Sequence, residues 1–575
     1  MKKPAYVLGL NFVYHEVSAC LLKDGKLLAA VEEERFSRIK RGKKCLIDNP
    51  DVLPVQSIEY CLSIAGISLR EVDYIGLSFM PEDRLRQNIG VDEYLTKGDW
   101  GTATGEKLFY KKLQKVPGMI SKLAGRDMMK KITWVPHHIC HASSAYFVSP
   151  FKESAVLTID GIGEFSSAWI GYGKNNAITN LYEISYPNSI GFLWEKMSKY
   201  IGFTEYDSSK VMGLAAYGNS KRFYTTFQKI VTLTPEGTFT VDTDVMRFRV
   251  EDYSRLEKIF GVKRIHSPKD IRKEQKDIAA ALQKITDDVV IHVAKYLKKK
   301  TGSDNICLAG GVALNCVCNN VLMKSGLFKN IYVQPAANDA GTALGVAYYL
   351  WNQVLGHKRS FVMDHVYWGP GYSDASIRSA LDKSKASYHK SANIAKELAG
   401  KIAEGNIAGW FQGRSEWGPR ALGNRSLLAD PRRKNMKRIL NERIKKREGF
   451  RPFAPSVLKE DAAGWFVIPK KSQSISTEFM EINFDIQKSK QKRIPAVTHI
   501  DGTGRVQLVN KKTNPLYHKL ISEFRRLTGV PILLNTSFND NEPIVCSPED
   551  ALKTFLRTKM DYLAIGPYLV SKKAK

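Results

Sequence analysis

The sequence predicts an α/β protein with at least two domains. Its 575 residues are more than a single hydrophobic core usually holds. Apolar, strand-like runs alternate with amphipathic, helix-like runs in both halves of the chain. In addition, one arrangement of strands and turns occurs twice in the first half.

The repeated arrangement is a buried strand, a polar turn, a second strand, a hairpin turn and a returning strand. The first copy has strands at 6–11, 19–22 and 27–31. The second copy has strands at 155–160, 168–172 and 178–184. Two related lobes of this kind are the layout of the actin, Hsp70 and sugar-kinase fold, which clamps a nucleotide between them. We therefore expect a duplicated-lobe domain in the first half.

The end of this domain is indicated by two helical patterns. A strongly amphipathic helix is expected at 278–300, and a second helix at 340–355. The segment 356–364 is interpreted as a linker. We therefore expect domains at 1–356 and 365–575, the second again with strands alternating with helices.

The formal net charge of +29 indicates either a nucleic-acid partner or anionic substrates. The lysines are spread along the chain and no RRM, zinc-finger or helix-turn-helix motif occurs, so we favour anionic substrates and expect no nucleic-acid partner. Because there is no apolar run of 18 residues and no signal-peptide pattern, we expect a cytoplasmic protein without a membrane partner. We also allow for a homodimer.

Residues 409–456 combine many cations with glycines and prolines. A solvated basic loop is the ordinary explanation of such a run. The interleaved glycines and prolines, together with Trp417 and Phe453, instead favour a pocket in which backbone N–H and guanidinium groups surround a polyanion such as ATP or an acyl phosphate. The candidate cations are Arg414, Arg420, Arg425, Lys445 and Arg451.

A candidate metal site begins with two histidines four residues apart. His137 and His141 fall on one face of a predicted helix, whereas His138 is turned away. A neutral imidazole pair can bind Fe(II), Zn(II) or Mn(II), although such a pair alone is weak evidence. Asp160 ends the first strand of the second repeat copy, and Asp339 lies at a strand–helix junction, so both carboxylates are placed to join the pair.

Three further segments place polar groups at turns. His15 lies in the polar turn of the first repeat copy, where a surface histidine is the alternative reading. Lys210, in S-S-K-V-M-G-L-A-A-Y-G, can neutralise a phosphate. A strand at 305–309 enters Gly310-Gly311 and continues to Asn315, which lets the backbone lie against a flat ligand or a phosphate. A purely structural turn is the alternative there.

Several of these segments are similar to family motifs. G-R-S-E-W-G-P-R-A-L-G-N-R-S and R-E-G-F-R-P-F-A-P-S, both within 409–456, resemble motifs of the carbamoyltransferases of the NodU/CmcH type. The segments E-E-E-R-F-S-R and G-G-V-A-L-N resemble further motifs of that family, in the same order. The turn at His15 matches as well, except that Glu16 stands where the family has Asp. The resemblance covers nearly the whole chain.

The resemblance implies a Kae1-like N-terminal domain of the actin/Hsp70 type and a YrdC/Sua5-like C-terminal α/β domain. It also implies that His137, His141, Asp160 and Asp339 together hold a metal ion. Two imidazoles and two carboxylates leave coordination positions open, so we expect Fe(II), with Mn(II) or Zn(II) as alternatives.

The resemblance further implies O-carbamoyl transfer in two stages. In the C-terminal domain, carbamoyl phosphate and ATP would give carbamoyl-adenylate and pyrophosphate. Mg²⁺ can accompany the ATP. In the N-terminal domain, His15 would help to deprotonate a hydroxyl of a small-molecule acceptor. The residues assigned to the adenylate there are Lys210, Gly310, Gly311 and Asn315. Those assigned to the first stage are Arg414, Arg420, Arg425, Lys445, Arg451, Arg505, Asn535 and Ser537.

Two other functions stay open at this point. One is threonylcarbamoyl-type modification of tRNA, and the other is a non-catalytic nucleotide-binding sensor. The acceptor cannot be read from the sequence. Residues 80–130 are expected to be an insertion, and residues 466–495, which are rich in lysine, to be mainly an exposed loop.

Overall fold

The computed structural model describes residues 4–88, 95–384, 386–469 and 475–572, and it is a mixed α/β protein, which confirms the predicted class. The chain divides into two compact units, each described separately here. Unit 1 comprises residues 1–34 and 41–363, and unit 2 comprises residues 35–40 and 364–575. Within the described residues, no helix combines the length and the apolarity needed to cross a membrane.

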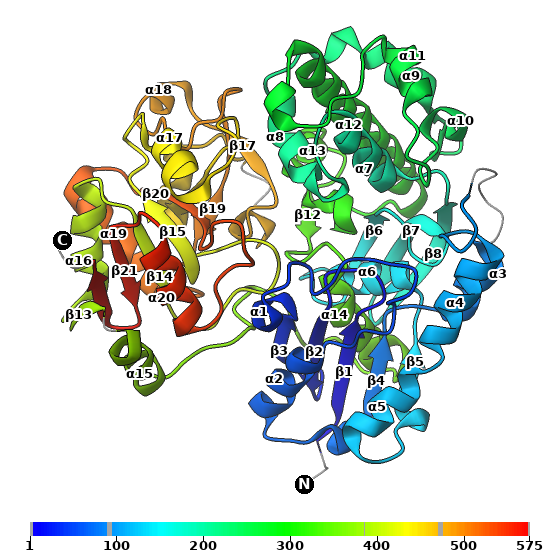
Figure 1. Cartoon of the computed structure of the whole chain (residues 1–575), viewed down its shortest axis with the longest axis horizontal. Coiled ribbons are helices and arrows are strands. Elements are labelled where there is room, and N and C mark those ends of the chain that lie inside the picture. Colours follow the sequence, from blue (N-terminus) through cyan, green and yellow to red (C-terminus); the bar gives the residue numbers. More distant parts are fainter. Residues whose placement is uncertain (1–3, 89–94, 385, 470–474, 573–575) are drawn as a thin grey trace. The chain divides into compact units, whose positions relative to one another are not determined.

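Unit 1 contains two five-stranded sheets with the same topology (Figure 1). The first has the order β3 (Lys26–Glu32), β2 (Ser18–Lys23), β1 (Tyr6–Asn11), β4 (Tyr74–Leu77), β5 (Ile132–Trp134). The second has the order β12 (Asn330–Val333), β11 (Asn305–Ala309), β6 (Glu153–Ile159), β7 (Ser166–Lys174), β8 (Ala177–Ser185). In each, the first strand in sequence runs antiparallel to the second and parallel to the next crossover strand. The repeat predicted from the sequence is therefore present in the structure.

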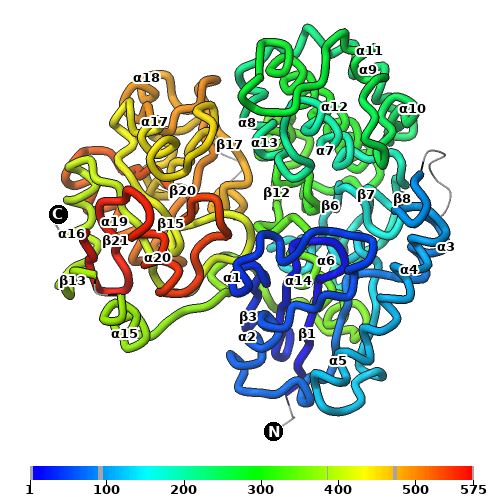
Figure 2. Tube along the Cα trace, in the orientation of Figure 1, coloured from blue at the N-terminus to red at the C-terminus, as the bar shows by residue number. Residues whose placement is uncertain are grey.

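The hairpin between β2 and β3 of the first sheet follows from its turn residues. β2 and β3 are joined through Asp24 and Gly25, which have φ angles of 49° and 75°. Such left-handed pairs match the twist of the flanking strands. Figure 2 follows this part of the trace from β1 to β3 in blue. Every residue of β1 is buried, as expected for a strand with neighbours on both sides.

Two glycines allow two helices and one strand of unit 1 to pack closely together. In α14 (Ala340–Tyr348), a Cβ added at Gly345 would lie 1.7 Å from the carbonyl oxygen of Cys140 in α6 (His137–Tyr146). A Cβ added at Gly9 of β1 would lie 1.9 Å from the carbonyl oxygen of Ala343. The two glycines therefore permit a close approach of β1, α14 and α6 that no other residue would allow.

Helices complete unit 1. The long amphipathic helix is α12 (Lys273–Thr301), which begins five residues earlier than the predicted start and buries Ile278, Leu282 and Ile285. The remaining elements of the unit are α2 (Val55–Ala65), α3 (Pro81–Gln87), α4 (Ala103–Leu113), α5 (Val116–Ala124), α7 (Ile190–Tyr200), α8 (Ser208–Ala215), α9 (Tyr224–Ile230), β9 (Val231–Leu233), β10 (Phe239–Val241), α10 (Thr243–Met246), α11 (Ser254–Phe260) and α13 (Cys316–Lys324).

Unit 2 is built on one eight-stranded sheet. Its order is β13 (Ser387–Lys390), β22 (Tyr568–Ser571), β21 (Tyr562–Ile565), β14 (Ala408–Phe411), β15 (Arg425–Ala429), β20 (Ile532–Ser537), β16 (Ala454–Leu458), β19 (Gln507–Val509). A separate antiparallel pair consists of β17 (Asn483–Asp485) and β18 (Thr503–Arg505). The helices are α15 (Asp374–Ser384), α16 (Ile394–Ala403), α17 (Met436–Leu440), α18 (Lys488–Gln491), α19 (Pro515–Thr528) and α20 (Pro548–Arg557).

Six residues from the start of the chain also belong to unit 2. Helix α1 (Glu34–Ser37) leads into this segment, residues 35–40, which we name the N-terminal strap. Arg35 donates to the carbonyl oxygen of Gly418 at 3.0 Å. Arg38 donates to the carbonyl oxygens of Pro543 and Ile544, both at 2.7 Å. The strap is thus hydrogen-bonded to two loops of unit 2.

The expectation that residues 466–495 are mainly an exposed loop is wrong for their central part. Residues 476–484 are all buried, and Phe479, Ile482 and Phe484 belong to the core of unit 2. The lysines that suggested exposure lie at the two ends of this segment, whereas S-T-E-F-M-E-I-N-F between them contains no lysine and four apolar residues. Residues 470–474 lie outside the described part of the chain.

Candidate metal centre and anion-binding cluster

Four side chains of unit 1 form a compact group of potential metal ligands. His137 and His141 lie one helical turn apart on α6, Asp160 follows β6, and Asp339 precedes α14. One ligand atom from each lies within 4.8 Å of those of the others. Nε2 of His141 is 3.0 Å from Nε2 of His137 and 2.9 Å from Oδ2 of Asp160. Both Nε2 atoms are 3.6 Å from Oδ1 of Asp339.

These separations fit a shared cation. Donor atoms that bind one ion at about 2.1 Å lie roughly 3 Å or slightly more from each other. Burial alone would lower the pKa of His137, but Asp339 and Asp160 raise it well above its usual value. Burial likewise opposes ionisation of Asp160, yet the two histidines hold its pKa well below the usual range. The group therefore places two carboxylates beside two imidazoles. These ligand types bind divalent transition metals.

The start of α6 is fixed by a carboxylate that the sequence analysis did not identify. Glu164 accepts hydrogen bonds from the backbone N–H of His137, at 2.9 Å, and of Met80, at 2.8 Å. A carboxylate at a helix N-terminus satisfies free N–H groups and complements the helix dipole. Burial raises the pKa of Glu164, partly offset by His137. Glu164 thus sets the position of the first histidine without being one of the four ligands.

His15 lies next to this group. Its Nδ1 is 3.4 Å from Oδ2 of Asp339, and its ring packs edge-on against Tyr206. The side-chain amide of Asn11 donates to the carbonyl oxygens of His15 and Glu16, both at 3.0 Å, which fixes the turn that carries the imidazole. Burial lowers the pKa of His15, against the opposing effect of Asp339. The structure therefore brings His15 to the four predicted ligands.

The other residues of unit 1 predicted to contact a nucleotide have mainly structural contacts here. Gly310 has a φ of 84°, and a Cβ there would lie 2.3 Å from the carbonyl oxygen of Ile159. A Cβ on Gly311 would lie 2.9 Å from Oδ1 of Asp160, so the glycine turn borders the metal group. Asn315 caps α13 by accepting from the N–H of Cys318, and Lys210 pairs with Asp207 at 2.9 Å.

In unit 2, one buried acid organises the basic segment. Oε1 of Glu416 accepts hydrogen bonds from the backbone N–H groups of Leu422 at 2.7 Å, Asn424 at 2.8 Å and Arg425 at 3.2 Å. The carboxylate therefore folds residues 416–425 around itself, as buried charges require hydrogen-bond partners. Gly418 and Gly423, at φ angles of 104° and 101°, supply the backbone conformations that this loop needs.

Two of the predicted cations donate hydrogen bonds to backbone carbonyl groups. Arg425 is fully buried, and its guanidinium donates to the carbonyl oxygens of Gln412, Asn424, Pro370 and Gly413. Arg414 donates to the carbonyl oxygens of Gly369 and Trp368. Their contacts are those of residues that hold the loop in shape.

Lys445, Arg447, Arg451 and Arg505 are linked by electrostatic repulsion, and Arg505 also acts, together with Arg420, on the buried Glu481. We name these five residues the cation cluster: Arg420, Lys445, Arg447, Arg451 and Arg505. Burial, followed by Arg447 and Arg451, lowers the pKa of Lys445 well below its usual value. Burial, followed by Arg451 and Arg505, lowers the pKa of Arg447 to about 9. Mutually repelling cations at buried positions are stabilised by a bound anion. The sequence analysis did not select Arg447.

The polar side chains predicted on β20 lie at different depths. Nζ of Lys445 donates to the carbonyl oxygen of Ser537 at 2.6 Å and to Oδ1 of Asn539 at 2.7 Å, so Lys445 and Ser537 are brought together. Asn535 is buried and donates to Ala421, Ser456 and Gln507. Asn539, two residues after Ser537, was not among the predicted site residues.

A second buried acid, also missed from the sequence, lies against the cation cluster. Oε1 of Glu481 is 3.5 Å from Nε of Arg420, and its side chain is 0% exposed. Arg451 lies nearer the surface, 3.7 Å from Glu448. Glu481 lies in the segment that was expected to be exposed, where no periodic pattern indicated a buried position.

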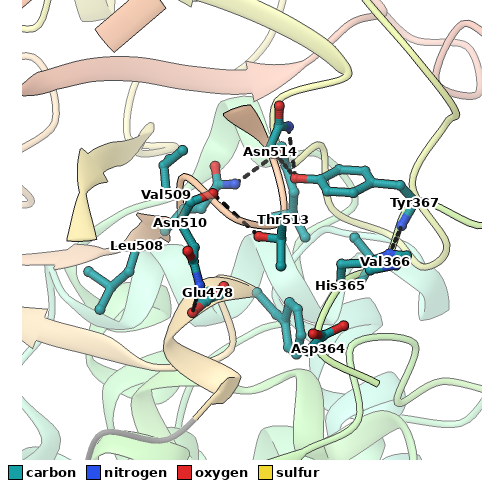
Figure 3. Close-up of a pocket in the computed structure, with 13 residues that line it drawn as sticks. Asp364, His365, Val366, Tyr367, Glu478, Leu508, Val509, Asn510, Thr513 and Asn514 are labelled. Carbon is teal, nitrogen blue, oxygen red and sulfur yellow. Dashed lines mark hydrogen bonds between the residues drawn. The ribbon is translucent and has the colours of Figure 1, made fainter. Parts of the chain in front are cut away.

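A separate small pocket in unit 2 is shown in Figure 3. Tyr367 donates to the carbonyl oxygen of Leu422 and accepts from Asn514, both at 2.9 Å, and Asn510 donates to Glu478 at 3.2 Å. None of the sequence-predicted site residues is among the 13 residues that line it.

Unit 1 thus contains a group of potential metal ligands, and unit 2 contains a cluster of cations beside a buried acid. Two family models match this chain: residues 6–348 match "Carbamoyltransferase N-terminus" and residues 399–572 match "Carbamoyltransferase C-terminus". The chain belongs to the carbamoyltransferase family and is a transferase, as the sequence motifs predicted.

Similar proteins span most of the chain. Nodulation protein NolNO of Sinorhizobium fredii is 38% identical over 98% of this chain and 80% of its own length. Nodulation protein NolO of Bradyrhizobium diazoefficiens is 41% identical over 76% of this chain and 79% of its own length. Among solved structures, component A of (R)-2-hydroxyglutaryl-CoA dehydratase from Acidaminococcus fermentans covers 61% of this chain and 99% of its own, with a TM-score of 0.36 and 17% identity.

Proposed function

We propose that this carbamoyltransferase is ATP-dependent and transfers the carbamoyl group to a hydroxyl of a small-molecule acceptor. The observation that carries the proposal is the cation cluster of unit 2. A cluster of five cations, in which burial and neighbouring cations lower the pKa of Lys445 and Arg447, is suited to a substrate with several phosphate charges. ATP and carbamoyl phosphate both meet this requirement.

In the first stage, unit 2 would form carbamoyl-adenylate. Carbamoyl phosphate reacts with water to give carbamate and inorganic phosphate, and a carbamate oxygen then attacks the α-phosphorus of ATP and displaces pyrophosphate. Arg420, Arg451 and Arg505 would neutralise the charge that develops on the phosphoryl oxygens, while Lys445 positions Ser537 and Asn539. Unit 2 would act in this stage as a YrdC/Sua5-like domain.

In the second stage, unit 1 would bind carbamoyl-adenylate, and the acceptor oxygen would attack the carbamoyl carbon with release of AMP. Unit 1 would act here as a Kae1-like domain with an actin-type nucleotide site. His15, whose pKa is lowered by burial, is placed to take the acceptor's proton. Its neighbour Asp339, 3.4 Å away, orients the ring.

The four-ligand group would hold Fe(II), with Mn(II) and Zn(II) as alternatives. When an ion is bound by His137, His141, Asp160 and Asp339, the site gains Lewis acidity towards oxygen ligands. Glu164 fixes the backbone of His137, and Asn11 fixes the turn of His15, so both imidazoles are oriented by groups of the chain itself.

The test is pyrophosphate release from ATP by the purified protein. We expect release that requires carbamoyl phosphate, and a loss of about 10²–10³ in rate for Arg420→Met, the usual effect of removing one preorganised charge donor. The matched control is Arg378→Met, because Arg378 is an arginine of unit 2 whose side chain is 68% exposed. Pyrophosphate release that does not depend on carbamoyl phosphate would contradict the proposal.

A further inference from the structure

The cation cluster is in contact with a carboxylate that cannot reach solvent. Glu481 lies between a short 3-10 helix, Ile475–Glu478, and β17, and its side chain is 0% exposed. Arg420 is 13% exposed and approaches the carboxylate through Nε at 3.5 Å. The second cation that acts on Glu481 is Arg505, on β18, the strand paired with β17. Both arginines are also proposed here to bind the substrate's phosphate oxygens.

An ionised carboxylate at such a position is stable only while cations compensate for its lost hydration. Burial raises the pKa of Glu481 to about 7, and Arg420 and Arg505 oppose this rise. The balance depends on where the two guanidinium groups point. A substrate anion that draws them away, and that adds negative charge nearby, removes the compensation and favours the protonated acid.

The surroundings of Glu481 differ from those of the other buried acid of this region. Glu416 accepts three backbone N–H groups, so its negative charge is satisfied by the loop itself and does not depend on the arginines. Glu481 is acted on electrostatically by Arg420, from the loop after β14, and by Arg505, from β18. His499, which precedes β18, is influenced by Arg505 in turn, and burial lowers its pKa to about 4.

We propose that Glu481 is a positioning residue that holds Arg420 and Arg505 when no substrate is bound, and that it takes up a proton when an anion binds to them. This inference deepens the proposed function and rests on it. The carboxylate acts as an internal counter-anion, and the incoming substrate replaces it electrostatically. Anion binding at the cation cluster is consequently coupled to pH.

The sign of the coupling follows from linkage. Burial raises the pKa of Glu481 to about 7 when no anion is bound, and on this proposal a bound anion raises that pKa further. Well below pH 7 the carboxyl group is protonated in both states, and affinity is independent of this group. As pH rises above 7, binding requires proton uptake, so anion affinity falls by up to about tenfold per pH unit until the pKa of the bound state is reached.

The experiment is calorimetric titration of the full-length protein with sulfate, which stays a dianion throughout this pH range. Measurements at pH 7.5 in buffers of different ionisation enthalpy give the number of protons taken up. We expect about 0.5–1 proton per sulfate for the wild type. The decisive quantity is the difference between the wild type and Glu481→Gln, because that difference isolates the protons taken up by Glu481.

The variant Glu481→Gln should bind sulfate with at least half a proton less uptake and with a flatter pH dependence. The matched control is Glu478→Gln, because Glu478 lies three residues away and pairs with Lys459 at 2.7 Å, outside the cluster. That control should take up as many protons as the wild type. A merely structural role for Glu481 would change the melting temperature but not the proton count.

The outcomes separate the two proposals. If the wild type binds neither sulfate nor pyrophosphate, the proposed anion site is wrong and this inference falls with it. If the wild type binds sulfate without proton uptake, or if Glu481→Gln takes up as many protons as the wild type, only the role of Glu481 is refuted. Should Glu481→Gln fail to fold, an unchanged wild-type affinity for sulfate between pH 7 and 8.5 would refute it equally.

Discussion

Arg425→Met tests whether this arginine holds the loop or binds substrate. In the wild type, Arg425 donates to four backbone carbonyl oxygens and lies 3.7 Å from the ring centre of Phe411. A hydrogen bond from a charged donor contributes about 1.5–3 kcal/mol, and such contributions are not additive. We therefore expect the loop to lose about 3–5 kcal/mol of local stability, because buried carbonyl groups are left without their donor.

Hydrogen exchange is the suitable assay, because a protein of two units need not unfold in one step. A loss of 3 kcal/mol corresponds to a roughly 100-fold faster exchange of amides in residues 412–428. The matched variant is Arg451→Met, whose arginine is nearer the surface and should change exchange less than about threefold. Unchanged exchange in Arg425→Met, combined with lost pyrophosphate release, would refute the loop-holding role.

The remaining predictions concern unit 1. His141→Ala should abolish stoichiometric Mn(II) binding in calorimetry, because one of four donors is lost; binding equal to the wild type would remove His141 from the ligand set. Gly345→Ala should lower both the melting temperature and Mn(II) affinity, the latter about 10–100-fold, because its Cβ meets the Cys140 carbonyl at 1.7 Å. Glu106→Ala should destabilise unit 1 by about 3–5 kcal/mol, because the substitution removes the carboxylate that contacts the buried Arg84 at 2.7 Å. A loss of less than about 1 kcal/mol, measured by hydrogen exchange, would contradict this prediction.

The sequence was most informative where local chemistry alone decides the structure. The strand 6–11 has the observed bounds, because six consecutive buried residues are followed by a polar turn. Asp24-Gly25 forms the predicted hairpin, because two left-handed residues are what such a turn needs. His137 and His141 share a helix face because of the helical period. Asp160 lies beside them, as its position at the end of a strand predicted.

The sequence was least informative where residues of the same type differ in burial and in their contacts. Arg420 and Arg425 lie in one motif, but only the fold shows that Arg425 is enclosed by carbonyl groups while Arg420 faces a buried acid. Glu481 carries no local signal, since its burial depends on contacts with a distant loop and strand. Glu164 was missed for the same reason, because its partners, Met80 and His137, are remote in sequence.

The N-terminal strap has a consequence for how the protein is made. Residues 35–40 leave the ribosome before any other part of unit 2 has been synthesised, and their partners at 418 and 543–544 emerge late. The nascent chain must therefore keep Arg35 and Arg38 available until translation is nearly complete. The hydrogen bonds of Arg38 to the carbonyl oxygens of Pro543 and Ile544 can therefore form only in a nearly finished chain.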